Sequence, residues 1–162
     1  MAKDYLAGKR VLVVDDEPDV VETVKQLLTM CQVTGVTSFS EGGELLEGES
    51  FDLVILDIMG VDGYALLEIA NRRGVIAVML TAHALSPENI VKSFKGGAAS
   101  YLPKDELANL AVFLNEILED KAKGKHFWFR WLERWAEFYD KKFGPGWRNE
   151  DKEFWEKFKY WV

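Results

Sequence analysis

One stretch restricts the fold more than any other: residues 53–56, an unbroken run of branched apolar side chains that ends in the carboxylate of Asp57. A run of this kind is typical of a strand that is buried on both faces of a sheet. Open sheets of parallel strands bind their ligands at the carboxyl ends of the strands. The stretch therefore predicts a central buried strand, and Asp57 is a candidate chemical centre at its end.

Apolar runs of the same kind alternate with helical patterns along the first 120 residues. This alternation predicts an α/β fold, in which helices cover both faces of a parallel sheet. The expected strands are residues 11–14, 33–39, 52–57, 75–80 and 100–103, and the expected helices are residues 18–30, 40–49, 64–72, 87–95 and 105–118.

Polar residues follow four of the five expected strands directly. Asp15 and Asp16 follow the first strand, Asp57 ends the third, Thr81 follows the fourth and Lys104 follows the fifth. Right-handed crossovers place all these strand ends at one edge of the sheet. Taken singly, an acidic pair is usually a solvated loop, a threonine a strand former and a lysine a surface residue. The ordered combination is far more specific and indicates a functional site.

The crowding of carboxylates at that edge predicts a bound cation. Two like charges about 4 Å apart repel each other by roughly 4 kcal/mol at an effective dielectric constant near 20. Ligands that are all oxygen favour Mg²⁺ or a similar hard ion. Lys104 suits a phosphoryl oxygen, and the Thr81 hydroxyl can hydrogen-bond another. Asp57 is then a nucleophile able to form an acyl phosphate.

The same residues lie in four segments of the chain, residues 11–17, 55–57, 80–82 and 97–104. Together these segments resemble the receiver domain of bacterial two-component response regulators. The resemblance covers about residues 8–120 and implies a flavodoxin-like (βα)5 three-layer sandwich with strand order 2-1-3-4-5. It implies that Asp57 accepts a phosphoryl group from a histidine kinase or a phosphotransfer protein. The chain is then no enzyme, but an acceptor that assists its own Mg-dependent phosphotransfer and dephosphorylation.

The resemblance also implies a metal site. Mg²⁺ would be held by Asp16, Asp57 and the backbone carbonyl of Met59, with Asp15 acting largely through water. The loop of residues 58–63 departs from the family pattern, because it lacks the usual proline and is about two residues shorter. Gly60 in this loop can absorb the tighter turn, since glycine tolerates conformations that other residues avoid.

Thr81 and Tyr101 match the two switch residues of the family. The resemblance implies that the hydroxyl turns toward the phosphoryl group and that the aromatic ring follows inward, while the small Ala82 leaves the site open. For Tyr101 the alternative is ordinary packing or a partner surface, although its position three residues before Lys104 favours the switch. His83 is either a residue that tunes the lifetime of the acyl phosphate or an exposed loop residue, and the latter is slightly favoured.

Residues 121–162 differ in composition from the rest of the chain. They carry 11 Lys/Arg against 7 Asp/Glu, whereas residues 1–120 carry 9 against 20. Of the 21 aromatic residues, 14 lie in residues 126–162, including all six tryptophans, and their spacing is helical. We therefore expect an aromatic-rich helical tail with no recognised output domain. Its aromatics either pack within the chain or form a partner interface, for example of a homodimer.

Two functions are compatible with this sequence. The first is a response regulator whose phosphorylation-dependent switch is read out through protein–protein contacts. The second is a phosphorylation-independent adaptor or dimerisation module built on a receiver fold. No helix-turn-helix pattern is visible and basic residues are interspersed with acidic ones, so we expect no direct DNA binding. The chain shows no signal peptide, no membrane span and a single cysteine, Cys31, which together predict a cytoplasmic protein.

Overall fold

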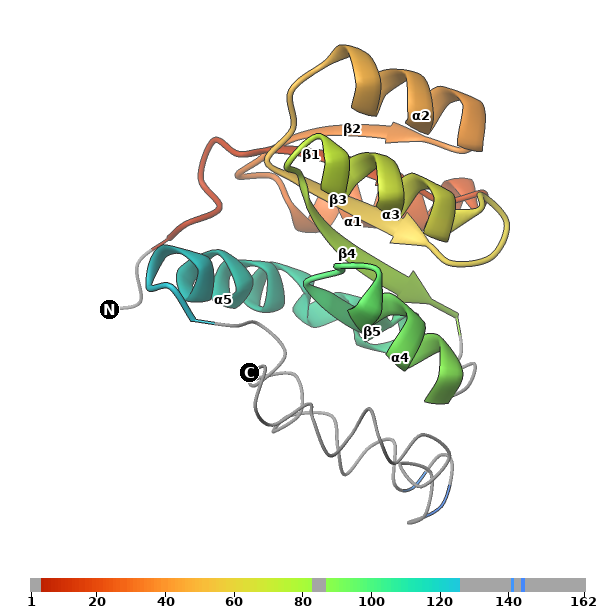
Figure 1. The fold of residues 1–162 in the computed structure, drawn as a ribbon. Coiled ribbons are helices and arrows are strands. Elements are labelled where there is room, and N and C mark those ends of the chain that lie inside the picture. The colour runs from red at the N-terminus through yellow and green to blue at the C-terminus, as the bar shows by residue number, and fades with distance from the viewer. Residues whose placement is uncertain (1–3, 83–86, 126–140, 142–143, 145–162) are drawn as a thin grey trace.

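The computed structural model describes residues 4–82 and 87–125, together with residues 141 and 144. This part of the chain forms a five-stranded parallel sheet of order β2-β1-β3-β4-β5 with helices around it (Figure 1). The predicted flavodoxin-like α/β architecture is confirmed. The elements are β1 (Arg10–Val14), α1 (Pro18–Leu27), β2 (Gln32–Val36), α2 (Phe39–Gly48), β3 (Leu53–Asp57), α3 (Gly63–Arg72), β4 (Ile76–Thr81), α4 (Pro87–Lys95), β5 (Ser100–Pro103), the 3-10 helix η1 (Lys104–Asn109) and α5 (Leu110–Ala122).

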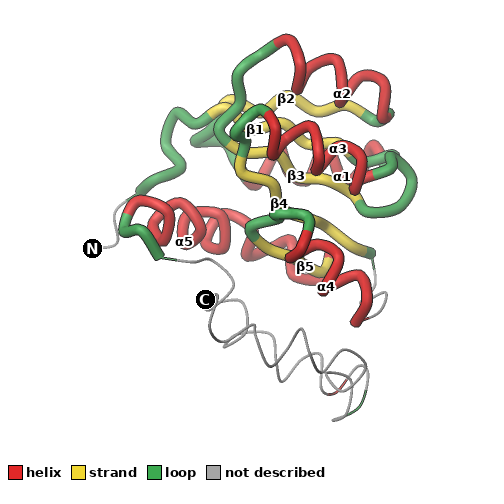
Figure 2. Tube along the Cα trace, viewed as in Figure 1, coloured by secondary structure: helices red, strands yellow, loops and turns green. Residues whose placement is uncertain are grey.

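The central strands are almost completely buried. All five residues of β3 are buried, and so are four of the five residues of β1. Helix α2 packs beside α3, whereas α1 lies against α5, so that helices cover both faces of the sheet (Figure 2). Burial on both faces explains why these strands are continuous apolar runs instead of alternating ones.

The register of the parallel strands brings their carboxyl ends level. Asp57 lies opposite Leu80 of the neighbouring strand, and Thr81 lies opposite Pro103. The last residue of β1, Val14, lies opposite Leu56, so Asp15 comes level with Asp57. Lys104 comes directly after β5. Polar residues from four strands therefore meet at one edge of the sheet.

The second strand is shorter than predicted. It ends at Val36, and Phe39 begins α2 with 43% of its surface exposed. Ser38 explains this boundary, because its hydroxyl oxygen accepts a hydrogen bond from the Glu41 amide at 3.2 Å. A serine in this N-cap position satisfies one of the free amides of the first helical turn and fixes where the helix starts.

Three other helix boundaries differ from the prediction by three residues or more, and one of them is the end of α5 at Ala122, four residues beyond residue 118. The helix expected from Asp105 begins as the 3-10 helix η1, which buries none of its residues, and the regular helix starts at Leu110, where burial begins. The first helix ends at Leu27, about one turn earlier than residue 30.

Of the aromatic tail predicted for residues 121–162, only residues 121–125, 141 and 144 belong to the described part of the chain, and the rest of the tail lies outside it. Within the described part of the chain, no helix has both the length and the apolar character needed to cross a membrane.

Candidate functional site

Four of the predicted site residues lie together at the carboxyl edge of the sheet. Asp15 is completely buried, and Asp57 and Thr81 expose only 6% and 1% of their surfaces. The side chain of Lys104 retains 11% exposure. Asp16, by contrast, is exposed. The sequence folds this way locally because each polar residue terminates an apolar strand whose burial ends at the sheet edge.

Lys104 is the residue that joins the cluster. Its Nζ atom lies 2.9 Å from Asp15 Oδ2, 3.0 Å from Glu17 Oε1 and 3.5 Å from Asp57 Oδ1. One ammonium group therefore faces three carboxylates that come from β3 and from the end of β1. These contacts hold the Lys104 ammonium beside the carboxylate that is the predicted nucleophile.

The electrostatics of the site favour proton uptake when no cation is bound. Burial, together with the charge of Asp15, raises the pKa of the Asp57 carboxyl to about 7, and Lys104 opposes both. Burial also raises the pKa of Asp15. For Lys104, burial lowers the pKa, but hydrogen bonds to Asp15 and Glu17 outweigh it and bring the pKa to about 12. The lysine is therefore charged at neutral pH.

The acidic residues have the chemistry of a site for a hard cation. Asp15, Asp16 and Glu17 each place a carboxylate oxygen within 4.8 Å of the other two. Asp57 is outside this group of three, although it contacts Asp16 closely enough for the Asp16 side chain to raise the Asp57 pKa. Carboxylate oxygens at this spacing suit Mg²⁺, which takes one or two of them and completes its shell with water.

The fourth predicted ligand, the Met59 carbonyl, lies in the loop between β3 and α3. It accepts a hydrogen bond from the Val61 amide, and the Met59 side chain is 66% exposed. A carbonyl oxygen has a second lone pair, so this hydrogen bond leaves it able to bind a cation. The assignment of Asp15, Asp16, Asp57 and Met59 as metal ligands stays a prediction.

The shortened loop makes its turn with two left-handed residues. Gly60 has φ +60° and Asp62 has φ +52°, and the Asp62 side chain caps α3 by accepting a hydrogen bond from the Ala65 amide. A Cβ atom on Gly60 would lie 2.5 Å from the Asp16 carboxylate. The glycine expected to absorb the turn therefore does so, and it also provides the space in which the Asp16 carboxylate lies.

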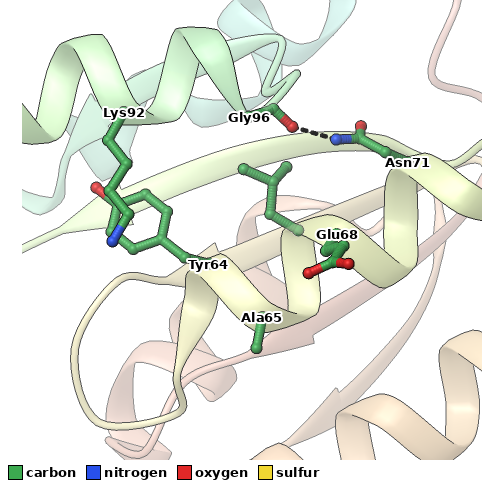
Figure 3. Close-up of a pocket in the computed structure, with 7 residues that line it drawn as sticks. Tyr64, Ala65, Glu68, Asn71, Lys92 and Gly96 are labelled. Atoms are coloured by element: carbon green, nitrogen blue, oxygen red, sulfur yellow. Dashed lines mark hydrogen bonds between the residues drawn. The ribbon is translucent and has the colours of Figure 1, made fainter.

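The two helices that follow the site strands are joined to each other. Near the start of α3, the Tyr64 hydroxyl donates a hydrogen bond to Asn89 Oδ1 of α4 at 2.7 Å, and Lys92 Nζ lies 4.1 Å from the centre of the Tyr64 ring. Figure 3 shows Tyr64 and Lys92 at one end of a groove and the hydrogen bond from Asn71 to the Gly96 carbonyl at the other. The start of α3, which follows the loop after Asp57, is thereby tied to α4.

Tyr101 is completely buried in β5, where it lies opposite Met79. Its ring is therefore in the inward position that the switch interpretation requires, although burial alone is equally consistent with packing. His83 lies outside the described residues.

Three contacts in the site were missed by sequence reasoning. Glu17 binds Lys104, Gly60 faces Asp16, and Tyr64 reaches α4. The signal for Glu17 was present, since it is the third acid in the run that follows β1. The contacts of Gly60 and Tyr64 depend on loop and helix geometry and have no local sequence signature.

Comparison with known proteins gives a consistent result. Residues 11–114 match the family model described as "Response regulator receiver domain". The chain is 34% identical over 133 residues to the two-component response regulator ARR12 of Arabidopsis thaliana, a match that covers 75% of this chain and 22% of that protein. It is 38% identical over 118 residues to the transcriptional activator protein PfeR of Pseudomonas aeruginosa, a match that covers 70% of this chain and 39% of that protein. The chain thus spans less than half the length of these curated relatives.

Solved structures show the same likeness. A CheY-like response regulator receiver domain protein from Methanospirillum hungatei matches with a TM-score of 0.65 and 33% identity, over 73% of this chain and 99% of that one. The BeF3-activated DrrB receiver domain matches with a TM-score of 0.62 and 26% identity, over 69% of this chain and 98% of that one.

Proposed function

We propose, because the chain belongs to the response regulator receiver domain family of two-component signalling, that Asp57 accepts a phosphoryl group from a histidine kinase or a phosphotransfer protein. The observation that carries the proposal is the position of Lys104 Nζ, 3.5 Å from Asp57 Oδ1 in a site that is almost closed to solvent. A buried carboxylate beside the largely covered Lys104 ammonium is suited to receive a dianionic phosphoryl group, because the ammonium can donate hydrogen bonds to the phosphoryl oxygens.

In the proposed step, an Asp57 Oδ atom attacks the phosphorus of the donor phosphohistidine. The new O–P bond forms as the N–P bond breaks, and the electron pair of that bond stays on the imidazole. Lys104 and the Thr81 hydroxyl hold phosphoryl oxygens as the charge on them grows. Asp16, Asp57 and the Met59 carbonyl would hold Mg²⁺, with Asp15 acting largely through water, and the ion would supply positive charge to offset the crowded carboxylates and the incoming phosphoryl oxygens.

This chain is an acceptor and not an enzyme with a separate substrate. Its residues assist the transfer onto Asp57 and the later hydrolysis of the acyl phosphate. We assign the readout to Thr81 and Tyr101, with protein–protein contacts as the output, in a cytoplasmic phosphoprotein. Support comes from the position of Thr81 at the site and from the inward position of the Tyr101 ring.

The test is phosphorylation of the full chain by a small acyl phosphate donor with Mg²⁺. We expect a phosphate that is labile to alkali and to hydroxylamine on the unaltered chain, and none on Asp57→Asn. Asp105→Asn is the matched control, because Asp105 is an exposed aspartate next to Lys104 in sequence. Undiminished labelling of Asp57→Asn would refute the assignment of the acceptor.

A second function is equally consistent with the position of the Tyr101 ring, which is completely buried opposite Met79, as a permanently packed core residue would be. A ring that stays inward suits an adaptor whose contacts do not depend on phosphorylation. Partner binding that is equal in the unaltered chain, with and without phosphodonor, and in Asp57→Asn would favour the adaptor. Binding that rises with phosphorylation and is lost in Asp57→Asn would favour the response regulator.

A further inference from the structure

A second concave site lies at the opposite edge of the sheet from Asp57. It is a groove of about 350 Å³ whose walls come from four separate parts of the chain. We call it the basal groove. Its walls are formed by Tyr5 and Lys9 before β1, Asp52 before β3, Ile76 at the start of β4, and Leu118 and Lys121 of α5.

The walls of the basal groove are fixed by hydrogen bonds. The Tyr5 amide donates to Asn115 Oδ1 at 2.6 Å, which holds the N-terminal segment against α5. Asp52 Oδ2 accepts from the Arg10 amide at 2.9 Å, and the Asp52 amide donates to the Arg10 carbonyl at 2.9 Å. The groove is therefore preformed, which reduces the entropy lost when a side chain enters it.

The groove is suited to an aromatic ring. Tyr5 and Ile76 are partly exposed and pack against the core, and they offer apolar surface that is open to solvent. Lys9 and Lys121 are among the lining residues and supply positive charge, and a cation over a ring face is attracted by the ring quadrupole. The volume is of the order of a small ligand site and admits one large side chain.

The chain leaves α5 beside this groove. The helix ends at Ala122, and Gly124, with φ +71°, turns the chain while the Lys125 amide donates to the Asp120 carbonyl at 2.8 Å. Such a left-handed glycine ends a helix and redirects the backbone beyond it. In Figure 1 this end of α5 lies on the same side of the molecule as the N-terminal segment.

The residues that come next are the most aromatic run of the chain: Phe127, Trp128 and Phe129. An extended chain advances at most about 3.6 Å per residue, so these rings begin within roughly 14 Å of Lys125. We propose that one ring of the segment 127–129 occupies the basal groove of its own chain. This intramolecular contact anchors the aromatic tail at the edge of the sheet opposite to the phosphorylation site.

The test uses NMR on the full chain and reads the methyl resonances of Ile76. A ring in the groove shifts these resonances, so the triple variant Phe127→Ala/Trp128→Ala/Phe129→Ala is expected to return them to ordinary positions. The matched control is Phe154→Ala/Trp155→Ala/Phe158→Ala, which removes the same set of rings, two phenylalanines and one tryptophan, from the distal part of the tail and is expected to leave Ile76 unchanged.

Tryptophan fluorescence gives a second measurement, because all six tryptophans lie in residues 126–162. Ile76→Glu is expected to shift the emission to longer wavelength and to increase quenching by acrylamide. The control is Ile69→Glu, which alters a partly exposed isoleucine of α3 outside the groove. If Ile76→Glu does not fold, the two tail variants still decide the question.

Three results would overturn the proposal. One is an Ile76 signal that is the same in the unaltered chain and in the variant of residues 127–129. Another is an equal change in the distal control. The third is an Ile76 shift that disappears on dilution together with a dimeric mass, which would assign the groove to a second copy of the chain.

Discussion

Substituting alanine for Gly60 tests how the shortened loop supports the metal site. Two effects are expected from the structure. First, φ +60° is a left-handed conformation that costs alanine about 1–2 kcal/mol relative to glycine. Second, the new Cβ atom would lie 2.5 Å from the Asp16 carboxylate, which must move because no real contact is so short.

The two effects are separated by Gly74→Ala. Gly74 has φ +71°, and a Cβ atom there would have no heavy atom within 4 Å. Both variants are therefore expected to lose about 1–2 kcal/mol in the free energy of unfolding, measured in urea. Only Gly60→Ala displaces Asp16, and we expect its Mg²⁺ affinity to fall by about 10–100-fold, the range typical of altered support for a metal ligand.

The assay is calorimetric titration with Mg²⁺, followed by the rate of phosphorylation by a small acyl phosphate donor at saturating Mg²⁺. Gly74→Ala is expected to match the unaltered chain in both. If Gly60→Ala binds Mg²⁺ as tightly as Gly74→Ala does, then Asp16 is not a metal ligand in this position, and the proposed ligand set is wrong.

Three further predictions concern the same region. Without metal, the folded Asp57 pKa of about 7 exceeds the unfolded value of about 4, so between these pH values the folded state retains a proton that the unfolded chain releases. Urea unfolding should therefore show the unaltered chain losing stability relative to Asp57→Asn as the pH rises from about 4 to about 7, and a constant difference would contradict the raised pKa. Lys104→Met removes the cation that faces Asp15 and Asp57. It should cost about 3 kcal/mol at about pH 7.5 but less at about pH 5, where Asp57, with a pKa of about 7, is protonated. An equal loss at both pH values would argue against the ion pair with Asp57. Tyr64→Phe keeps the ring beside Lys92 but loses the hydrogen bond to α4, and should cost about 1 kcal/mol; an unchanged urea midpoint would show that this bond does not stabilise the fold.

The sheet could be predicted because burial dominates it. Strands β1, β3 and β4 are buried on both faces, so nearly every position in them needs an apolar residue. The result is a continuous apolar run in the sequence that stops where the strand stops. The same rule located Asp15, Asp57, Thr81 and Lys104, since each of them is the first polar residue at or after the end of such a run.

The boundaries of the less buried elements were harder to predict. No residue of β2 is fully buried, so its pattern is weak, and the capping bond of Ser38 rather than hydrophobicity sets where the next helix begins. Leu107 of the 3-10 helix η1 continues the helical spacing of the apolar residues of α5 but is only partly buried, so periodicity alone did not distinguish η1 from α5.

The contacts of Glu17, Gly60 and Tyr64 depend on long-range geometry. Glu17 and Lys104 are 87 residues apart, and they meet only because β1 and β5 both end at the same edge of the sheet. The role of Gly60 depends on the tight loop and on the direction of the Asp16 side chain. The acidic run after β1 is a local signal for Glu17 but does not say which lysine it meets, and the Gly60 contact has no local signal. The sequence therefore predicted the acceptor but not these contacts around it.

The central claim is that the phosphoryl group is carried by Asp57, and reductive trapping tests it most directly. Borohydride converts the acyl phosphate of an aspartate to homoserine, and peptide mass spectrometry then identifies the converted position. After treatment of the full chain with phosphodonor and Mg²⁺, we expect homoserine at position 57 alone. Homoserine at Asp15 or Asp16 instead, or a phosphorylated chain with no converted aspartate, would contradict the account.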